Sequence, residues 1–281
     1  MIRTKKLIFL LPLFVAALLL ILTVREQVYK APSLELGIKT KGLLQDFAGE
    51  KIVYDVRMGR LRLGKAEFNN VGTVEMDGKK LYLMTMLTEV TQFKDLEKIY
   101  SDPKTFLPVK VERDIAKLIM REKITELYDQ QKFVLKITKE KGESKEEKII
   151  TRNGPIHNAV LLPFYVRHIN GLKTGKVITA NLPNRAYQIK LISVEEIKVP
   201  GGTFQAFHFT STPRQMEIWI SADEYRIPLK IQGTGLFGYS LLMSEYSKPG
   251  AKEEPPKPSA ADETAPAAPA PGDDPGNKGT E

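Results

Sequence analysis

The stretch IWISADEYRIPLKIQ, residues 218–232, decides the fold because it has the pattern of two strands joined by a turn. Ile218 and Ile220 alternate with other side chains in its first part, and Leu229 and Ile231 do so in its second. Alternation of this kind is typical of strands that bury one face. The intervening SADEY supplies the polar residues that turns favour. The stretch therefore predicts two antiparallel strands and a turn.

Three carboxylates, Glu217, Asp223 and Glu224, surround Trp219, the single tryptophan of the chain. A catalytic acid–base pair needs two carboxylates that converge and whose pKa values are driven apart by burial or repulsion. Nothing in this spacing predicts such convergence. A turn in which an aspartate binds its own backbone needs only the local sequence. We therefore interpret the acids as turn residues, and we predict no catalytic residue here.

The middle of the chain, residues 49–247, has mostly strand-like alternation interrupted by frequent turn signals. Asp77-Gly78 is a strong hairpin signal, and Pro200-Gly201 is placed for a type II turn. Residues 114–129 also fit helical spacing, but strand-like segments surround them, so we predict strand there. This spacing favours a mainly β domain, an antiparallel meander curled into a barrel or half-barrel.

One short helix is predicted at about residues 154–170. Pro163 can occupy a first helical turn, because its missing N–H is not needed there. Gly171 fits the position just after a helix end. The helix is the one expected interruption of the meander.

Both ends of the chain differ from the middle. Residues 7–24 carry no charged side chain and follow a basic segment, which predicts a transmembrane signal anchor. A signal peptide that is cleaved is the alternative. The last residues are rich in Pro, Ala, Gly and acids and are expected to be disordered. The predicted division is a cytoplasmic segment at 1–6, the anchor at 7–24, a linker at 25–47, the β domain at 48–247 and the tail at 248–281.

The net charge is +8, and the chain contains no cysteine. Basic proteins often bind nucleic acid, but here acids interleave with the lysines, as in KITKEKGESKEEK, and the anchor places the domain outside the cytoplasm. We therefore expect no nucleic-acid partner. Without cysteine there is no disulfide framework, no thiolate chemistry and no cysteine metal site.

The usual residue patterns of enzymes are missing from the sequence. His157, His168 and His208 include no pair at the i, i+4 spacing of helical metal ligands. No G-x-S-x-G nucleophile elbow occurs. We therefore predict no metal, no cofactor and no enzymatic activity.

Aromatic and apolar strand residues are the remaining candidates for a functional surface. The expected inner face of the curled sheet comprises Phe68, Leu83, Phe106, Ile189, Phe204, Phe207, Phe209, Trp219 and Phe237. A curled sheet can enclose an apolar groove. The candidates for such a groove are Phe204, Ala206, His208, Trp219, Ala66 and Phe68. An ordinary closed core is the alternative.

Five segments together resemble the bacterial envelope family called domain of unknown function 3108. They are GEKIVYDVRMGRLRLGKAEF, SDPKTFLPVK, PFYVRHINGLKTGK, VPGGTFQAFHF and IWISADEYRIPLKIQ, in that order along the chain. One departure is Glu224-Tyr225, where the family pattern has a more glycine-like turn. The resemblance implies an antiparallel, β-rich exported domain, and it brings no established activity and no catalytic residues.

Two functional hypotheses follow from these observations. The first is an inner-membrane protein, tethered by residues 7–24, whose periplasmic β domain binds an apolar envelope component such as a lipid or acyl chain. The second is a structural or interaction domain of an envelope assembly, with a protein partner and no small-molecule ligand. If the signal is cleaved, the domain is instead secreted to the periplasm.

Overall fold

The computed structural model describes residues 47–234 and 238–249. The predicted anchor at 7–24, Phe237 and almost all of the predicted tail lie outside these residues. Within the described ranges, no helix has both the length and the apolar character needed to cross a membrane.

The described residues form fourteen strands and the short helix α2. The strands of the first half are β1 (Lys51–Met58), β2 (Leu61–Met76), β3 (Lys79–Val90), β4 (Phe93–Ser101), β5 (Pro108–Lys117), β6 (Met120–Asp129), β7 (Val134–Lys141) and β8 (Ser144–Thr151). After them come α2 (Leu162–Arg167), β9 (Val177–Asn181), β10 (Ala186–Val199), β11 (Gly202–Thr212), β12 (Met216–Ser221), β13 (Pro228–Gly233) and β14 (Tyr239–Ser247).

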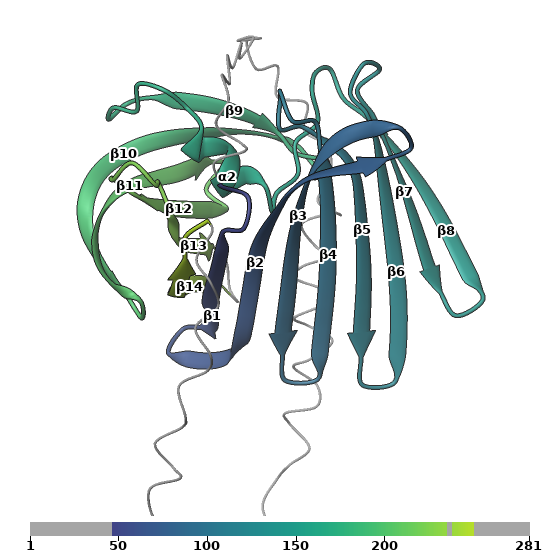
Figure 1. Ribbon diagram of the computed structural model, residues 1–281, viewed down its shortest axis with the longest axis horizontal. Coiled ribbons are helices and arrows are strands. Elements are labelled where there is room, and N and C mark those ends of the chain that lie inside the picture. Colours follow the sequence, from purple (N-terminus) through teal and green to yellow (C-terminus); the bar gives the residue numbers. More distant parts are fainter. Residues whose placement is uncertain (1–46, 235–237, 250–281) are drawn as a thin grey trace, which may run out of the picture. The chain divides into compact units, whose positions relative to one another are not determined.

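All strands belong to one antiparallel sheet in the order β8-β7-β6-β5-β4-β3-β2-β1-β14-β13-β12-β11-β10-β9. Two meanders, β1–β8 and β9–β14, join where β1 pairs with β14, for example Lys51 with Ser247. Figure 1 shows β1–β8 as a curved wall and β10–β11 as a tighter curl. The predicted antiparallel, mainly β fold is confirmed. The sheet is open, with β8 and β9 as its edges, so it is a half-barrel and not a closed barrel.

The two predicted turns have different outcomes. Asp77 and Gly78 both have positive φ, 52° and 71°, as a type I′ hairpin turn requires. The turn at Pro200-Gly201 exists, but the positive φ lies at Gly202, so the predicted type II geometry is wrong. Gly201 instead allows a close approach, because its N–H donates to the Met243 carbonyl at 3.0 Å. A Cβ at Gly201 would lie 2.8 Å from the Met243 sulfur.

The segment at 114–129 is β5 and β6, as predicted, and helix α2 lies within the predicted helical range. The helix has only six residues, with a proline in its first turn as expected. It begins late because the preceding loop is bound to the sheet, where the His157 N–H donates to the Asn181 carbonyl at 2.7 Å. Gly171, with φ of 65°, follows the helix end.

Helix α2 separates two hydrophobic cores. Phe164 and Tyr165 pack in the larger core with residues of β1–β7, whereas Leu162 and Val166 pack in the smaller core with β9–β12. The expected inner face is therefore divided. The larger core contains Phe68, Phe106 and Trp219, and Phe204 packs against it. The smaller core contains Ile189 and Phe209, and Phe207 packs against it. Leu83 belongs to neither core, because its neighbours on β3 point inward instead.

A buried ion pair fastens α2 to the start of β1. Arg167 Nη1 and Nη2 donate to the two oxygens of Glu50 at 2.8 and 2.9 Å, and the two side chains are 1% and 0% exposed. Asn70 also donates to Glu50, and Arg167 donates to the Tyr225 carbonyl. The guanidinium lies 3.8 Å from the centre of the Phe47 ring. This pair fixes the helix within the curve of the sheet.

Candidate functional site

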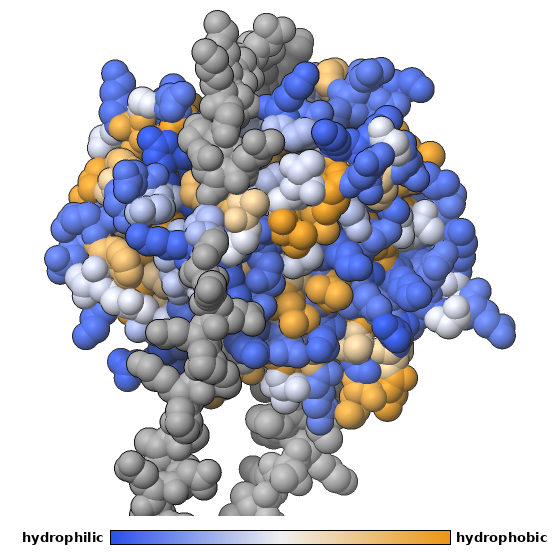
Figure 2. Space-filling model, viewed as in Figure 1, coloured by the Kyte–Doolittle hydropathy of each residue, from blue (hydrophilic) through white to orange (hydrophobic). Residues whose placement is uncertain are grey.

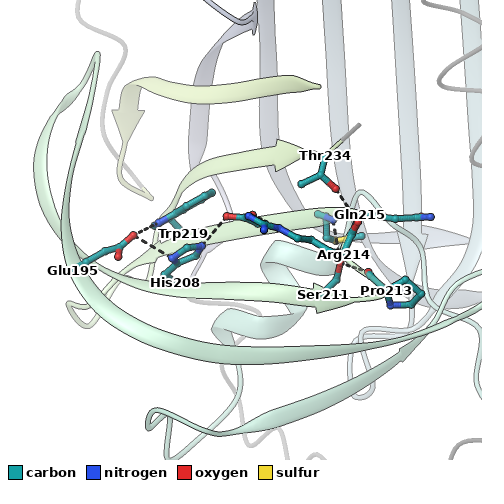
Figure 3. Close-up of polar contacts among 10 residues, drawn as sticks. Glu195, His208, Ser211, Pro213, Arg214, Gln215, Trp219 and Thr234 are labelled. Carbon is teal, nitrogen blue, oxygen red and sulfur yellow. Dashed lines mark hydrogen bonds and ion pairs between the residues drawn. The ribbon is translucent and has the colours of Figure 1, made fainter. Parts of the chain in front are cut away.

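A polar cluster occupies the curl formed by β10, β11 and β12. Strand register places His208 opposite Trp219 and Glu195 opposite Ala206, so these side chains share one face. The two ring nitrogens of His208 face two carboxylates: Nδ1 lies 3.1 Å from Glu195 Oε1, and Nε2 lies 3.0 Å from Glu217 Oε2. Figure 3 shows the imidazole between Glu195 and the β12 side chains. Only a doubly protonated imidazole can donate to both carboxylates.

Trp219 forms the floor of this cluster and is 5% exposed. His208 stacks on the indole with ring centroids 4.0 Å apart and an interplanar angle of 18°. The indole Nε1 donates to Glu195 Oε1 at 2.7 Å. Lys230 Nζ, from β13, lies 4.0 Å from the ring centroid, which is a cation–π distance. The tryptophan is therefore held by three polar side chains from three strands.

The charges of the cluster shift the pKa values of its own members. Burial raises the pKa of Glu217, but hydrogen bonds from Arg214 and His208 outweigh it and leave that pKa lowered. The hydrogen bond from Trp219 lowers the pKa of the Glu195 carboxyl. Burial lowers the pKa of Lys230, and the carboxylates of Glu217 and Glu195 only partly oppose this. Among the residues that the structure describes, no carboxylate lies within ion-pair distance of the Lys230 ammonium.

Apolar side chains border the cluster on the same face. Lys230 pairs with Leu242 of β14, and Phe204 pairs with Ile197 near the turn of the β10–β11 hairpin. All three apolar residues are half-buried and pack against the larger core. The contact of Gly201 with β14 bends this hairpin around the face. The site is thus a partly enclosed polar cluster with an apolar border.

The structure divides the six predicted groove residues. Phe204, Ala206, His208 and Trp219 share the curled face. Pairing through β12, β13, β14, β1 and β2 carries this face to Lys65, so Ala66 and Phe68 lie on the opposite face of the sheet. The six therefore do not share one face of the sheet, although Ala66, Phe68, Ala206 and Trp219 all belong to the larger core. The physical reason is that strand faces alternate residue by residue, and sequence spacing alone does not relate the faces of strands that do not follow each other.

The predicted groove residues lie apart from the two voids beside helix α2. Ala206 is fully buried, and so is Ala66. Two voids of about 10 Å³ each lie beside helix α2, and none of the six groove residues lines them. A void of that size holds about one water molecule.

The acidic stretch of β12–β13 separates into two environments. Asp223 Oδ1 accepts hydrogen bonds from the Tyr225 and Arg226 N–H groups, both at 3.0 Å, and from the Ser221 hydroxyl at 2.7 Å. It is the turn aspartate that the sequence predicted. The positive φ of this turn, 47°, falls at Arg226. Glu217 is the one acid of the stretch that belongs to the polar cluster.

The other two histidines lie apart from this cluster. His157 Nδ1 accepts the Asn181 N–H at 3.1 Å, and burial lowers the pKa of His157 to about 4. Burial, together with Arg167 and Arg226, lowers the pKa of His168 to about 3. Both rings are therefore neutral packing elements at physiological pH. No group of three potential metal-binding side chains occurs within residues 47–234 and 238–249.

A second charged group lies on the opposite side of the domain, on β4–β6. Arg113 pairs with Asp95 and lies 3.5 Å from Glu97. Burial raises the pKa of Glu97 to about 7, and the nearby charges of Glu126 and Asp95 add to this effect. The sequence analysis missed this group, although alternating acids within an apolar strand, as in FKDLEKIYS, are a usable signal.

Glu195, Arg214 and Lys230 were also missed. Each lies on the same sheet face as a predicted residue or directly beside one. Their proximity depends on the register of strand pairing, which cannot be read from the sequence.

Comparisons with known proteins bear on family rather than on chemistry. A β-barrel-like protein of domain of unknown function 1849 from Brucella abortus matches with a TM-score of 0.45 and 8% identity, over 72% of this chain and 98% of that one. A Bacteroides fragilis protein with a YmcC-like fold matches with a TM-score of 0.27 and 8% identity, over 72% and 96%. No curated protein matches.

The family model described as protein of unknown function, DUF3108, matches residues 53–243. This range contains most of the sheet, helix α2 and the whole polar cluster. The chain therefore belongs to the DUF3108 family.

Proposed function

We propose that this protein is a non-enzymatic domain of the bacterial envelope that binds an amphipathic component with an acidic head group, such as a fatty acid or lipid, on the curled face of β10–β14. The predicted anchor at 7–24 supports an inner-membrane protein with its β domain in the periplasm. Secretion after cleavage of that segment is the alternative.

One observation carries the proposal: the Lys230 ammonium lies half-buried over Trp219 without a carboxylate at ion-pair distance among the described residues. The carboxylates of Glu217 and Glu195 only partly offset the burial of this ammonium, and an anionic ligand group in direct contact would offset it further. The adjacent Leu242, and the half-buried Ile197 and Phe204 on the same face, suit an acyl chain. An acidic head group at Lys230 with its chain along these residues satisfies both parts of the surface.

The arrangement supports binding rather than catalysis. A general base needs a free acceptor within reach of the substrate proton. Here both nitrogens of His208 face carboxylates, and the Asp223 carboxylate is bound to its own turn. These bonds hold side chains in place and leave Lys230 as the charged group of the cluster that has no carboxylate at ion-pair distance among the described residues.

The experiment is the quantification of lipid extracted from the purified full-length protein by mass spectrometry. Lys230→Gln removes the cation and keeps a similar chain length. Lys198→Gln, at an exposed position near the end of β10, is the matched control. We expect an acidic lipid in the parent and the control and a strong reduction in Lys230→Gln. Equal amounts in all three proteins, or none in any, would contradict the proposal.

A structural or interaction domain without a small-molecule ligand is the second candidate. The burial of Ala206 favours this second candidate, because neither of the two voids beside α2 borders that residue. A stable envelope protein co-purifying with the full chain, with no acidic lipid present, would support this candidate instead.

A further inference from the structure

The turns β1–β2, β3–β4, β5–β6 and β7–β8 lie at the same end of the sheet, because successive strands run in opposite directions (Figure 1). The β5–β6 turn differs from the others in composition. Its two residues, Leu118 and Ile119, are 68% and 90% exposed, and the following Met120 is 37% exposed. Three consecutive apolar side chains therefore project from the end of one hairpin. Figure 2 shows a hydrophobic patch at the end of the sheet where this turn lies.

This turn also breaks the usual chemistry of hairpins. Two-residue turns favour Asn, Asp and Gly, which adopt positive φ easily. Asp77-Gly78 follows that rule at the other end of the sheet. Neither Leu118 nor Ile119 has a positive φ, so this is not a type I′ turn, and neither is one of the residues that turns favour. Both side chains bury little surface in this fold, which makes them candidates for contact with another surface.

Basic side chains flank the apolar tip. Lys117 precedes it, and Arg121 and Lys123 follow it. The nearest acids on this hairpin are already paired, Asp114 with Arg121 and Glu122 with Lys117. The hairpin end therefore carries three cations and two anions, an excess of one positive charge.

The β1–β2 turn repeats the combination. Leu61 is 60% exposed and lies between Arg60 and Arg62, of which Arg62 pairs with Asp55 of β1 at 3.0 Å. Strands β2 and β5 are three positions apart in the sheet, about 15 Å at the usual spacing of about 4.8 Å per strand. Two hairpin ends on this side of the sheet, with the β3–β4 turn between them, thus present exposed leucine or isoleucine side chains among cations.

We propose that the end of the sheet formed by the β5–β6 and β1–β2 turns docks on an anionic lipid bilayer, with Leu118 and Ile119 inserted among the head groups. Exposed apolar side chains gain free energy when they leave water, and the flanking cations favour anionic lipid. The positive charge of both hairpin ends is the reason to assign a lipid surface rather than a neutral protein groove. This inference concerns a surface separate from the curl of β10–β14 and stands without the proposed ligand.

The absence of cysteine makes the test direct. An Ile119→Cys variant of the full-length chain is labelled with an environment-sensitive fluorophore and reconstituted into vesicles of phosphatidylcholine, with or without phosphatidylglycerol. A Val194→Cys variant, 49% exposed on β10, is labelled in the same way as the control. Because both labels sit on the same membrane-associated chain, any anchor affects them equally.

We expect roughly a twofold or larger rise in emission, with a blue shift, at residue 119 in anionic vesicles only, reduced by high salt. The label at 194 should not respond. An equal response in neutral vesicles, no response, or the same response at both positions would overturn the proposal. A response at 119 that grows with protein concentration in the absence of lipid would show self-association instead and would also overturn it.

A second variant separates docking from folding. Leu118→Ser with Ile119→Asn replaces two exposed apolar side chains by polar residues that turns favour without positive φ, so the unfolding midpoint should not fall. With the label at Leu61→Cys, this double change should abolish the response to anionic vesicles. A normal response from the label at 61 would contradict a role for the β5–β6 tip.

Discussion

Two clusters of the domain in which a cation lies over an aromatic ring differ in what else the cation contacts. Arg167 lies 3.8 Å from the centre of Phe47, is buried, and both of its terminal nitrogens reach Glu50. Lys230 lies 4.0 Å from the centre of Trp219, is half-buried, and has no carboxylate at ion-pair distance among the described residues. The first cluster joins helix α2 to the sheet, whereas the second is the one that we propose to bind a ligand.

The largest expected effect comes from breaking the first cluster. Glu50→Gln leaves the Arg167 guanidinium buried without its counter-charge, and we expect a loss of about 3–5 kcal/mol in the free energy of unfolding. Urea unfolding of the full-length protein measures it. Lys51→Gln, which breaks a more exposed pair with Glu67, is the control and should cost about 1 kcal/mol or less. Similar losses in the two variants would mean that the buried pair does not fasten the fold.

The buried charged group around Arg113 is a third case, in which the effect of a buried carboxyl on stability depends on pH. The pKa of Glu97 rises to about 7 on folding, above the unfolded value of 4.5. Between these values the native state holds a proton that the unfolded state releases, so stability falls as pH rises from about 4.5 to about 7. Glu97→Gln should remove this cost and stabilise the domain by up to about 3 kcal/mol at pH 8. Unfolding at pH 8 and pH 4 checks it, because the gain should disappear at pH 4.

The packing of the curl is tested by Ala206→Trp. Ala206 is fully buried on the same face as Trp219, and neither void beside α2 borders it, so we expect a larger ring to be overpacked. We expect a loss of about 1–3 kcal/mol or more, the usual cost of overpacking. Thermal unfolding measures it. A midpoint equal to that of the parent would reveal open space at this position and would move the proposed acyl chain from the border into the interior of the curl.

A small effect is expected at the turn between β12 and β13. Asp223→Asn with Glu224→Gln should cost at most about 1 kcal/mol, since only local turn hydrogen bonds are weakened. Lipid content should stay at the level of the parent. Loss of lipid with an unchanged unfolding midpoint would show that these acids belong to the binding site.

The sequence predicted the parts of the fold that depend on local spacing. Alternation identified the strands, Asp77-Gly78 identified a hairpin, and Asp223 was recognised as a turn residue. The pairing of β1 with β14 could not be predicted, because these strands lie at opposite ends of the domain sequence and nothing local relates them. For the same reason, the sequence could not show that Ala66 and Ala206 lie on opposite faces of the sheet. Each alternates with a phenylalanine two positions away along its own strand, so the local pattern is the same.

The candidate site was predicted only in part for the same reason. His208 and Trp219 were identified from their own strands, but Lys230 and Glu195 join them only through register across β10–β13. Bulges add to the difficulty, because each shifts the register by one position, as between Trp219 and Ile220. Sequence alternation assigns residues to two faces of a strand, and only the pairing decides which faces meet.

The central claim is that the Lys230–Trp219 cluster binds an acidic amphiphile, and Trp219, the only tryptophan, reports on it directly. The measurement is the quenching of tryptophan fluorescence in the full-length protein by a brominated fatty acid. We predict saturable quenching in the parent and in Lys198→Gln, and roughly tenfold weaker binding in Lys230→Gln, as expected for the loss of one charge-assisted contact of about 1.4 kcal/mol. Quenching that does not saturate, or that is the same in Lys230→Gln, would contradict the account.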